Sequence, residues 1–212
     1  MDLREQLCEF GLSLYQRGLT HGSTGNLSAR LPNGQLLVTP TGCSLGRLTP
    51  EGLAVINPDG SLDGGPAPTK EVPLHRAFYQ SRAAHTGAVV HLHSCYATTL
   101  SLLPCDDEDD WLPALTPYGI MQLGQVRLLP YRVPGSPSIA QDIHDLAGRH
   151  SAVMLANHGP VVTGKTLEAA VYAAEELEAT AKLAYLTRAL EPNRLSPAQI
   201  SELVTQFNVP WN

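Results

Sequence analysis

Basic residues are scarce in this chain of 212 residues. It has 14 Lys and Arg against 20 Asp and Glu, which gives a formal net charge of -6. No broad basic face can be drawn from so few cations, and this argues against a nucleic-acid partner. Long apolar runs are also missing, because none approaches the ~20 residues that cross a membrane. Residues 1–6 are charged and lead into no apolar stretch of the kind that a secretion signal has.

Cysteine is sparse too, with four residues and no C-x-x-C pair. Without a secretion signal, this composition predicts reduced thiols in a cytoplasmic protein that binds no membrane. The nucleotide-binding patterns G-x-x-x-x-G-K-[ST] and G-x-G-x-x-G are absent as well. There is neither an internal repeat nor a linker that would separate two domains, so we expect a single domain over residues 1–212.

The hydrophobic periodicity alternates between helical and extended segments. Helices are expected over residues 2–18, 70–81, 94–103, 137–149, 166–190 and 197–206, and strands over 27–29, 36–38, 54–56, 88–93, 126–129, 152–155 and 160–163. We expect no regular structure at 64–68, and an irregular, Pro-rich segment over most of 111–135. Because tight turns as well as helices join the strands, the pattern predicts a mixed or antiparallel sheet with helices on its faces.

The pair His91-x-His93 ends an apolar run. Residues two apart on a strand face the same way, so both imidazoles would lie on one face, as in many divalent-metal sites. The alternative is a surface strand that happens to carry two histidines. Cys95 continues the alternation and could be a further ligand, but Ser94 has the character of a helix N-cap that would end the strand before it.

His158 lies between two apolar strands, in Asn157-His158-Gly159. By itself, a histidine there could equally be a core or hairpin residue. Together with the pair it would complete a three-histidine site with an open coordination position, which is the catalytic arrangement for zinc. Cobalt, nickel, iron or manganese could also occupy such a site. The other helical or loop histidines are expected to be structural or solvated; they are His75, His85, His144 and His150.

Glu71 lies at the expected start of a helix, next to Thr69 and Lys70. One interpretation is structural: Thr69 caps the helix, and its dipole favours an acid in the first turn. The other is a general acid/base beside a metal. Two turns, Thr24-Gly25-Asn26 and Thr41-Gly42, present backbone N–H groups beside hydroxyls, an arrangement that binds anions such as phosphate, although ordinary turn chemistry explains it as well.

These residues together resemble the class II aldolase/adducin family. The resemblance runs from about residue 3 to 190 and rests on motifs in a fixed order: Thr24-Gly25-Asn26-Leu27-Ser28, Thr41-Gly42, Lys70-Glu71-x-x-x-His75, His91-x-His93-Ser94 and Asn157-His158-Gly159. It implies a three-layer α/β/α fold around a mainly antiparallel sheet. It also implies a fourfold-symmetric homotetramer with active sites near subunit interfaces and one divalent metal per subunit, with zinc expected.

The resemblance also assigns roles to individual residues. His91, His93 and His158 match the metal ligands, and Glu71 matches the catalytic acid/base. The phosphate-binding residues would be Gly25, Asn26, Thr41, Gly42, Thr69 and Lys70. Tyr118 matches, more loosely, a tyrosine that reaches the site of a neighbouring subunit.

Lys70 beside Glu71 bears on the reaction. Sugar-phosphate aldolases of the family usually have a small hydroxyl residue before the Glu, and the epimerases have Asp in place of the Glu. The pair Lys70-Glu71 instead resembles the decarboxylase branch, which converts a 3-oxo-tetronate 4-phosphate to dihydroxyacetone phosphate and CO2. In that chemistry, loss of CO2 leaves an enediolate to which Glu71 returns a proton. Lys70 could hold the substrate's phosphate or its carboxylate, or could simply face solvent.

Two other functions stay open. The first is a class II aldolase acting on a ketose 1-phosphate such as L-fuculose 1-phosphate, although the tail from Gln206 to Asn212 lacks the tyrosine that some aldolases have there. The second is a non-catalytic binding domain like that of adducin. Members of that kind tend to lose metal ligands, whereas all three histidines and Glu71 are present here.

Overall fold

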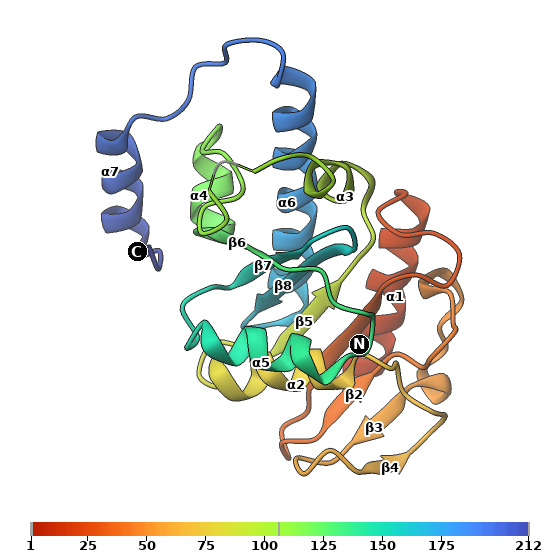
Figure 1. Ribbon diagram of the computed structural model, residues 1–212. Coiled ribbons are helices and arrows are strands. Elements are labelled where there is room, and N and C mark those ends of the chain that lie inside the picture. The colour runs from red at the N-terminus through yellow and green to blue at the C-terminus, as the bar shows by residue number, and fades with distance from the viewer. Residues whose placement is uncertain (1, 106, 212) are drawn as a thin grey trace.

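The computed structural model describes residues 2–105 and 107–211, and one eight-stranded sheet runs through them in the order β4-β3-β2-β1-β5-β8-β7-β6 (Figure 1). The strands are β1 (Asn26–Arg30), β2 (Leu36–Val38), β3 (Ala54–Ile56), β4 (Leu62–Gly64), β5 (Ala88–His91), β6 (Val126–Leu129), β7 (Ala152–Leu155) and β8 (Gly159–Gly164). Among the described strands, only β6 and β7 pair in parallel. The expectation of a mainly antiparallel sheet is therefore confirmed.

Helices cover both faces of this sheet. They are α1 (Leu3–Gln16), α2 (Val72–Ser81), α3 (Cys95–Ser101), α4 (Pro117–Leu123), α5 (Pro137–Asp145), α6 (Leu167–Thr187) and α7 (Pro197–Phe207), with short 3-10 turns at Leu45–Arg47 and Pro50–Gly52. One apolar cluster joins α1, α3, α4 and α6 to one face, and a second joins α2 and α5 to the other. Figure 1 shows α2 and α5 side by side. This is the expected three-layer α/β/α architecture.

Local sequence explains where the main helices begin. The Asp2 carboxylate accepts from the Glu5 backbone N–H, and the Glu5 side chain accepts from the Asp2 backbone N–H, which forms a capping box at the start of α1. Leu7 and Leu14, seven residues apart on one stripe, are fully buried beneath it. Thr166 caps α6 by a single bond, with its side chain accepting from the Ala169 N–H. None of the described helices is both long and apolar enough to span a bilayer.

The structure corrects the expected elements in four places. Strand β5 ends at His91 rather than at residue 93, so His93 lies beyond the strand. Helix α4 forms inside the segment expected to be irregular, because Pro117 occupies its first position and Thr116 caps it by accepting from the Gly119 N–H. Strand β4 extends to Gly64, at the edge of the sheet, where regular structure was not expected. Helix α2 begins at Val72 rather than at residue 70, with Glu71 as its N-cap.

The register of the central strands brings distant residues together. Asn26, the first residue of β1, lies opposite His91, the last residue of β5, and His91 lies opposite Val161 of β8. A tight turn joins β7 to β8, and Asn157 adopts a left-handed conformation in it (φ 58°), which Asn tolerates better than most residues. His158 follows directly, so the turn places it beside the end of β5.

Candidate active site

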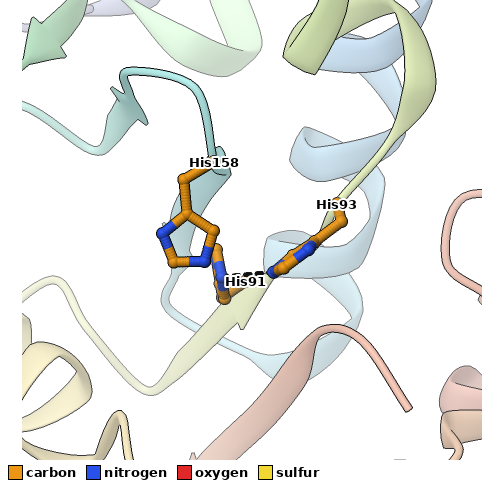
Figure 2. Close-up of side chains that lie close together, drawn as sticks. All are labelled: His91, His93 and His158. Atoms are coloured by element: carbon orange, nitrogen blue, oxygen red, sulfur yellow. Dashed lines mark hydrogen bonds between the residues drawn. The ribbon is translucent and has the colours of Figure 1, made fainter. Parts of the chain in front are cut away.

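Three imidazoles converge where β5 ends and β8 begins. The ring centroids of His91 and His93 are 5.0 Å apart, and that of His158 lies 4.8 Å from His91 and 4.7 Å from His93. Figure 2 shows His91 at the end of β5, His158 at the turn that leads into β8 and His93 in the segment that leads into α3. One ligand nitrogen from each residue lies within 4.8 Å of the other two. The fold thus assembles the three histidines that the sequence singled out.

The chemistry of these nitrogens fits a divalent metal ion. His91 Nδ1 donates to the Pro160 carbonyl oxygen at 2.9 Å, which leaves a lone pair on its Nε2. That Nε2 lies 3.2 Å from His93 Nε2. Burial lowers the pKa of His93 to about 3 and that of His158 to about 4, so both rings are neutral at neutral pH, the form that binds metals. The cluster can therefore hold one divalent ion.

Glu71 faces this cluster from the start of α2. Its Oε2 lies 3.4 Å from His91 Nε2, and its Oε1 lies 3.7 Å from His158 Nε2. The carboxyl group is nearly buried. Burial acts to raise the pKa of Glu71, but the His91 imidazole and a hydrogen bond from Asn26 outweigh it, so the pKa lies below its ordinary value. The carboxylate is ionised at neutral pH and is turned toward the histidines, not toward the backbone of its own helix.

A buried chain of hydrogen bonds leads away from Glu71. Asn26 Nδ2 donates to Glu71 Oε2 at 2.8 Å, and Asn26 Oδ1 is bonded to His75 Nε2. His75 Nδ1 is bonded to Ser28 Oγ at 2.7 Å, and Ser28 Oγ to the Tyr79 hydroxyl at 2.9 Å. All five residues are buried. The side chain of Asn26, expected to bind phosphate, thus contacts Glu71.

A cavity of about 250 Å³ opens beside Glu71 and the histidines. Its lining combines the two Gly-containing turns, the segment before α2, two of the histidines and Pro134. The residues are Ser23, Thr24, Gly25, Asn26, Pro40, Thr41, Gly42, Thr69, Lys70, Glu71, His93, Pro134 and His158. Lys70 is its sole Lys or Arg among the described residues. A larger cavity of about 500 Å³ lies between α3, α6 and α7, but its lining contains no histidine and none of the expected site residues.

Gly25 and Gly42 shape the turns at this cavity. Both have positive φ angles, 77° and 68°, which glycine adopts without strain. Gly25 is also spatially required, because a Cβ atom there would lie 2.9 Å from the His91 carbonyl oxygen. Thr69 and Thr41 lie in adjacent segments, since the Thr69 N–H donates to the Thr39 carbonyl and the Thr41 N–H to that of Ala67. The two turns and Lys70 therefore border one site.

Three details of the site differ from the sequence-based expectations or extend them. Thr69 does not cap α2; its Oγ1 accepts from the Glu71 N–H at 3.3 Å, one position before the helix. His75, expected to be structural or solvated, is fully buried and bonded to Asn26. Sequence patterns gave no signal for this contact, since it depends on how α2 packs on the sheet. Tyr118 is 62% exposed on α4 and does not line the cavity.

Helix α3, which follows His93, is capped by a side chain of another helix. Ser94 is the N-cap of α3, as the sequence suggested, but its side chain makes no capping bond. The Glu178 carboxylate of α6 does so instead, accepting from the backbone N–H groups of Tyr96 at 2.8 Å and Ala97 at 2.9 Å. Cys95, the first residue of α3, is exposed and lies outside the histidine cluster. Glu178 thus fixes the segment that carries His93.

The fold and the site define a class of protein: a three-layer α/β/α protein with a three-histidine cluster that can hold a divalent metal and a carboxylate beside it. The chain belongs to the class II aldolase family, because the profile of the class II aldolase and adducin N-terminal domain matches residues 5–185. This confirms the resemblance that the motifs indicated.

Individual relatives agree with this assignment. The chain is 45% identical to the 3-oxo-tetronate 4-phosphate decarboxylase of Escherichia coli (strain CFT073) over 201 residues, 95% of this chain and 94% of the relative. It is 35% identical to the L-fuculose phosphate aldolase of Methanococcus maripaludis (strain S2) over 90% of this chain and the whole relative. The crystal structure of YgbL from Escherichia coli superimposes with a TM-score of 0.92, at 44% identity, over 95% of this chain and 97% of that one.

Proposed function

We propose that the protein is a metal-dependent carboxy-lyase that converts a 3-oxo-tetronate 4-phosphate to dihydroxyacetone phosphate and CO2. The observation that carries this is the placement of Glu71 against three converging histidines, at a cavity bordered by two Gly-containing turns and Lys70. The choice of substrate is supported by relatives named as 3-oxo-tetronate 4-phosphate decarboxylases, which are 43–45% identical over more than nine-tenths of the chain.

A divalent ion held by His91, His93 and His158 would supply a Lewis acid that withdraws electron density from the bond that breaks. The turns at Gly25 and Gly42 would bind the phosphate through backbone N–H groups. Lys70 would hold a second anionic group or share the phosphate.

Glu71 would carry the proton. The C1–C2 bond breaks, C1 leaves as CO2, and the electron pair remains on the substrate. Glu71, which is ionised in the resting protein, would first take up a proton from solvent, and delivery of that proton to C2 would then complete the CH2OH group of dihydroxyacetone phosphate. The carboxylate can play this part because it is nearly buried, one hydrogen bond holds its Oε2, and its Oε1 has no hydrogen-bond partner among the described residues.

The remaining features of the proposal come from the family resemblance. Zinc is the expected ion, since three neutral imidazoles suit it. We further propose a single cytoplasmic domain that assembles into a homotetramer, with Tyr118 reaching the site of a neighbouring subunit. The exposure of Tyr118 leaves its ring available for such a contact. Sedimentation should then give about four times the mass of the 22.8 kDa chain.

The test is a direct comparison of substrates. Zinc-loaded protein is incubated with 3-oxo-tetronate 4-phosphate and, separately, with L-fuculose 1-phosphate, while CO2 and aldehyde are measured. We expect CO2 from the first substrate and no aldehyde from the second. Aldehyde release without CO2 would replace this proposal with the aldolase.

The aldolase is the second candidate, supported by the 35% identical L-fuculose phosphate aldolase and by the shared fold. Lys70 argues against the aldolase function, because sugar-phosphate aldolases of the family usually have a small hydroxyl residue before the Glu. A binding domain without activity is supported less well, because the donor set for a metal is complete. Metal analysis tests this third function, since a protein that neither retains nor binds zinc would favour it.

A further inference from the structure

The hydrogen-bond chain behind Glu71 has a defined direction. An ionised carboxylate only accepts hydrogen bonds, so the Asn26 group that faces Glu71 Oε2 is the NH2 group. Asn26 Oδ1 then points at His75 and can only accept, which places a proton on His75 Nε2. Each member of the chain thus fixes the orientation of the next.

The direction continues beyond the imidazole. His75 is fully buried, and this burial lowers its pKa to about 3, so the ring is neutral and its Nδ1 is an acceptor. Ser28 Oγ must therefore donate to Nδ1, and the Tyr79 hydroxyl must donate to Ser28 Oγ. Every donor in the chain points toward Glu71.

We infer that His75 is a positioning residue for the reaction: together with Ser28 and Tyr79 it fixes the amide of Asn26 so that its NH2 group holds Glu71 Oε2. This inference rests on the proposed function for the role of Glu71. The arrangement leaves Oε1, which has no hydrogen-bond partner among the described residues, as the oxygen that exchanges a proton with the substrate. Without His75, Asn26 Oδ1 loses its donor, and the bond to Glu71 Oε2 is left to fix the amide alone.

The direction can be measured without any assay of activity. Side-chain 15N NMR of zinc-loaded protein labelled at histidine reports the tautomer of each ring, and His75→Phe identifies the His75 signals by their loss. We expect neutral His75 with its proton on Nε2, unchanged between pH 6 and 8. A proton on Nδ1, or a doubly protonated ring, would overturn the inference even if the protein proves to be a decarboxylase.

Kinetics test the positioning role. His75→Phe removes both hydrogen bonds of the ring. Ser28→Ala, a second variant in case the first does not fold, leaves the bond to Asn26 and removes the donor to Nδ1 together with the acceptor for the Tyr79 hydroxyl. We expect each to lower kcat, His75→Phe by about 10- to 100-fold, the range for losing a partner that orients a site residue. KM and zinc content should change little. Ser81→Ala is the matched control, because its hydroxyl lies on the same helix and bonds only to the Ala77 carbonyl.

A double-mutant cycle separates positioning from a general structural role. If His75 and Ser28 act through Asn26, then Ser28→Ala or His75→Phe should lower kcat no further once Asn26→Ala is present. Effects that multiply in the double variants would contradict the inference. Failure of the proposed function would look different from failure of this inference. Wild-type protein would then release no CO2, while the tautomer of His75 would stay as expected.

Discussion

At the scale of single residues, Glu71 combines near-complete burial with a carboxylate that contacts the histidine cluster. Glu71→Gln keeps the size of the side chain and removes its acid/base function. We expect kcat to fall roughly 10²–10⁴-fold, the usual contribution of a general acid or base. Zinc content, measured by atomic emission, should stay at one ion per subunit. A variant that retains most of its kcat would remove Glu71 from the mechanism.

Lys70 gives a second prediction at this scale. Because it is the cavity's sole Lys or Arg among the described residues, Lys70→Gln should weaken substrate binding. A charge-assisted hydrogen bond is worth about 1.5–3 kcal/mol, so KM should rise about 10- to 100-fold. Lys165→Gln, beyond the end of β8, is the control and should leave KM as in the parent. Equal KM values in both variants would place Lys70 in solvent, as its exposure alone would suggest.

The site residues that the sequence could predict are those marked by spacing or turn composition within a short segment of the chain. His91 ends β5, His93 lies two residues further along the chain, and His158 lies in the turn before β8, so residue spacing and turn composition indicate all three. The contacts of Asn26 with Glu71 and His75 could not be read in this way. They depend on the antiparallel register that sets Asn26 opposite His91 and on the way α2 packs over the sheet.

At the scale of elements, α3 depends on a residue of another helix. The Glu178 carboxylate accepts from the backbone N–H groups of the second and third residues of α3, shortly after His93. Glu178→Ala should cost about 1–2 kcal/mol, as the loss of a helix cap does, and lower Tm by about 2–8 °C. Zinc affinity should fall as well, because the segment that carries His93 loses its anchor. Glu202→Ala, exposed on α7, is the control, and an equal change of Tm in both variants would contradict the capping role.

Long, strongly periodic elements were predicted correctly, whereas α4 and β4 were not. Leu7 and Leu14 mark α1 through an apolar stripe that its own sequence displays. Helix α4 has seven residues in a Pro-rich segment, and packing against α6 and α7 supports it. Strand β4 has three residues, none of them buried, so hydrophobic alternation gives no signal for it. Such short elements are defined by their neighbours in space.

At the scale of the whole molecule, buried neutral histidines link stability to pH. The pKa values of His75 and His93 are lowered to about 3 and that of His158 to about 4, against an ordinary value of 6.5. The unfolded chain therefore binds more protons than the folded one below about pH 6.5. The free energy of unfolding of metal-free protein should be constant above this pH and fall as the pH drops toward 4. Urea unfolding at pH 7.5, 6 and 5 measures this, and equal values at all three would contradict it.

The close approach of Gly25 to the His91 carbonyl fixes the distance between the turn at Gly25 and the end of β5. With Asn26 paired to His91 in the sheet, the turn that would hold a phosphate and the strand end that would hold a metal cannot move apart without breaking backbone pairing. The site would thus select substrates by the distance between their phosphate and their reacting carbon. A homologue of the substrate with one more carbon between these groups could engage one end or the other, but not both.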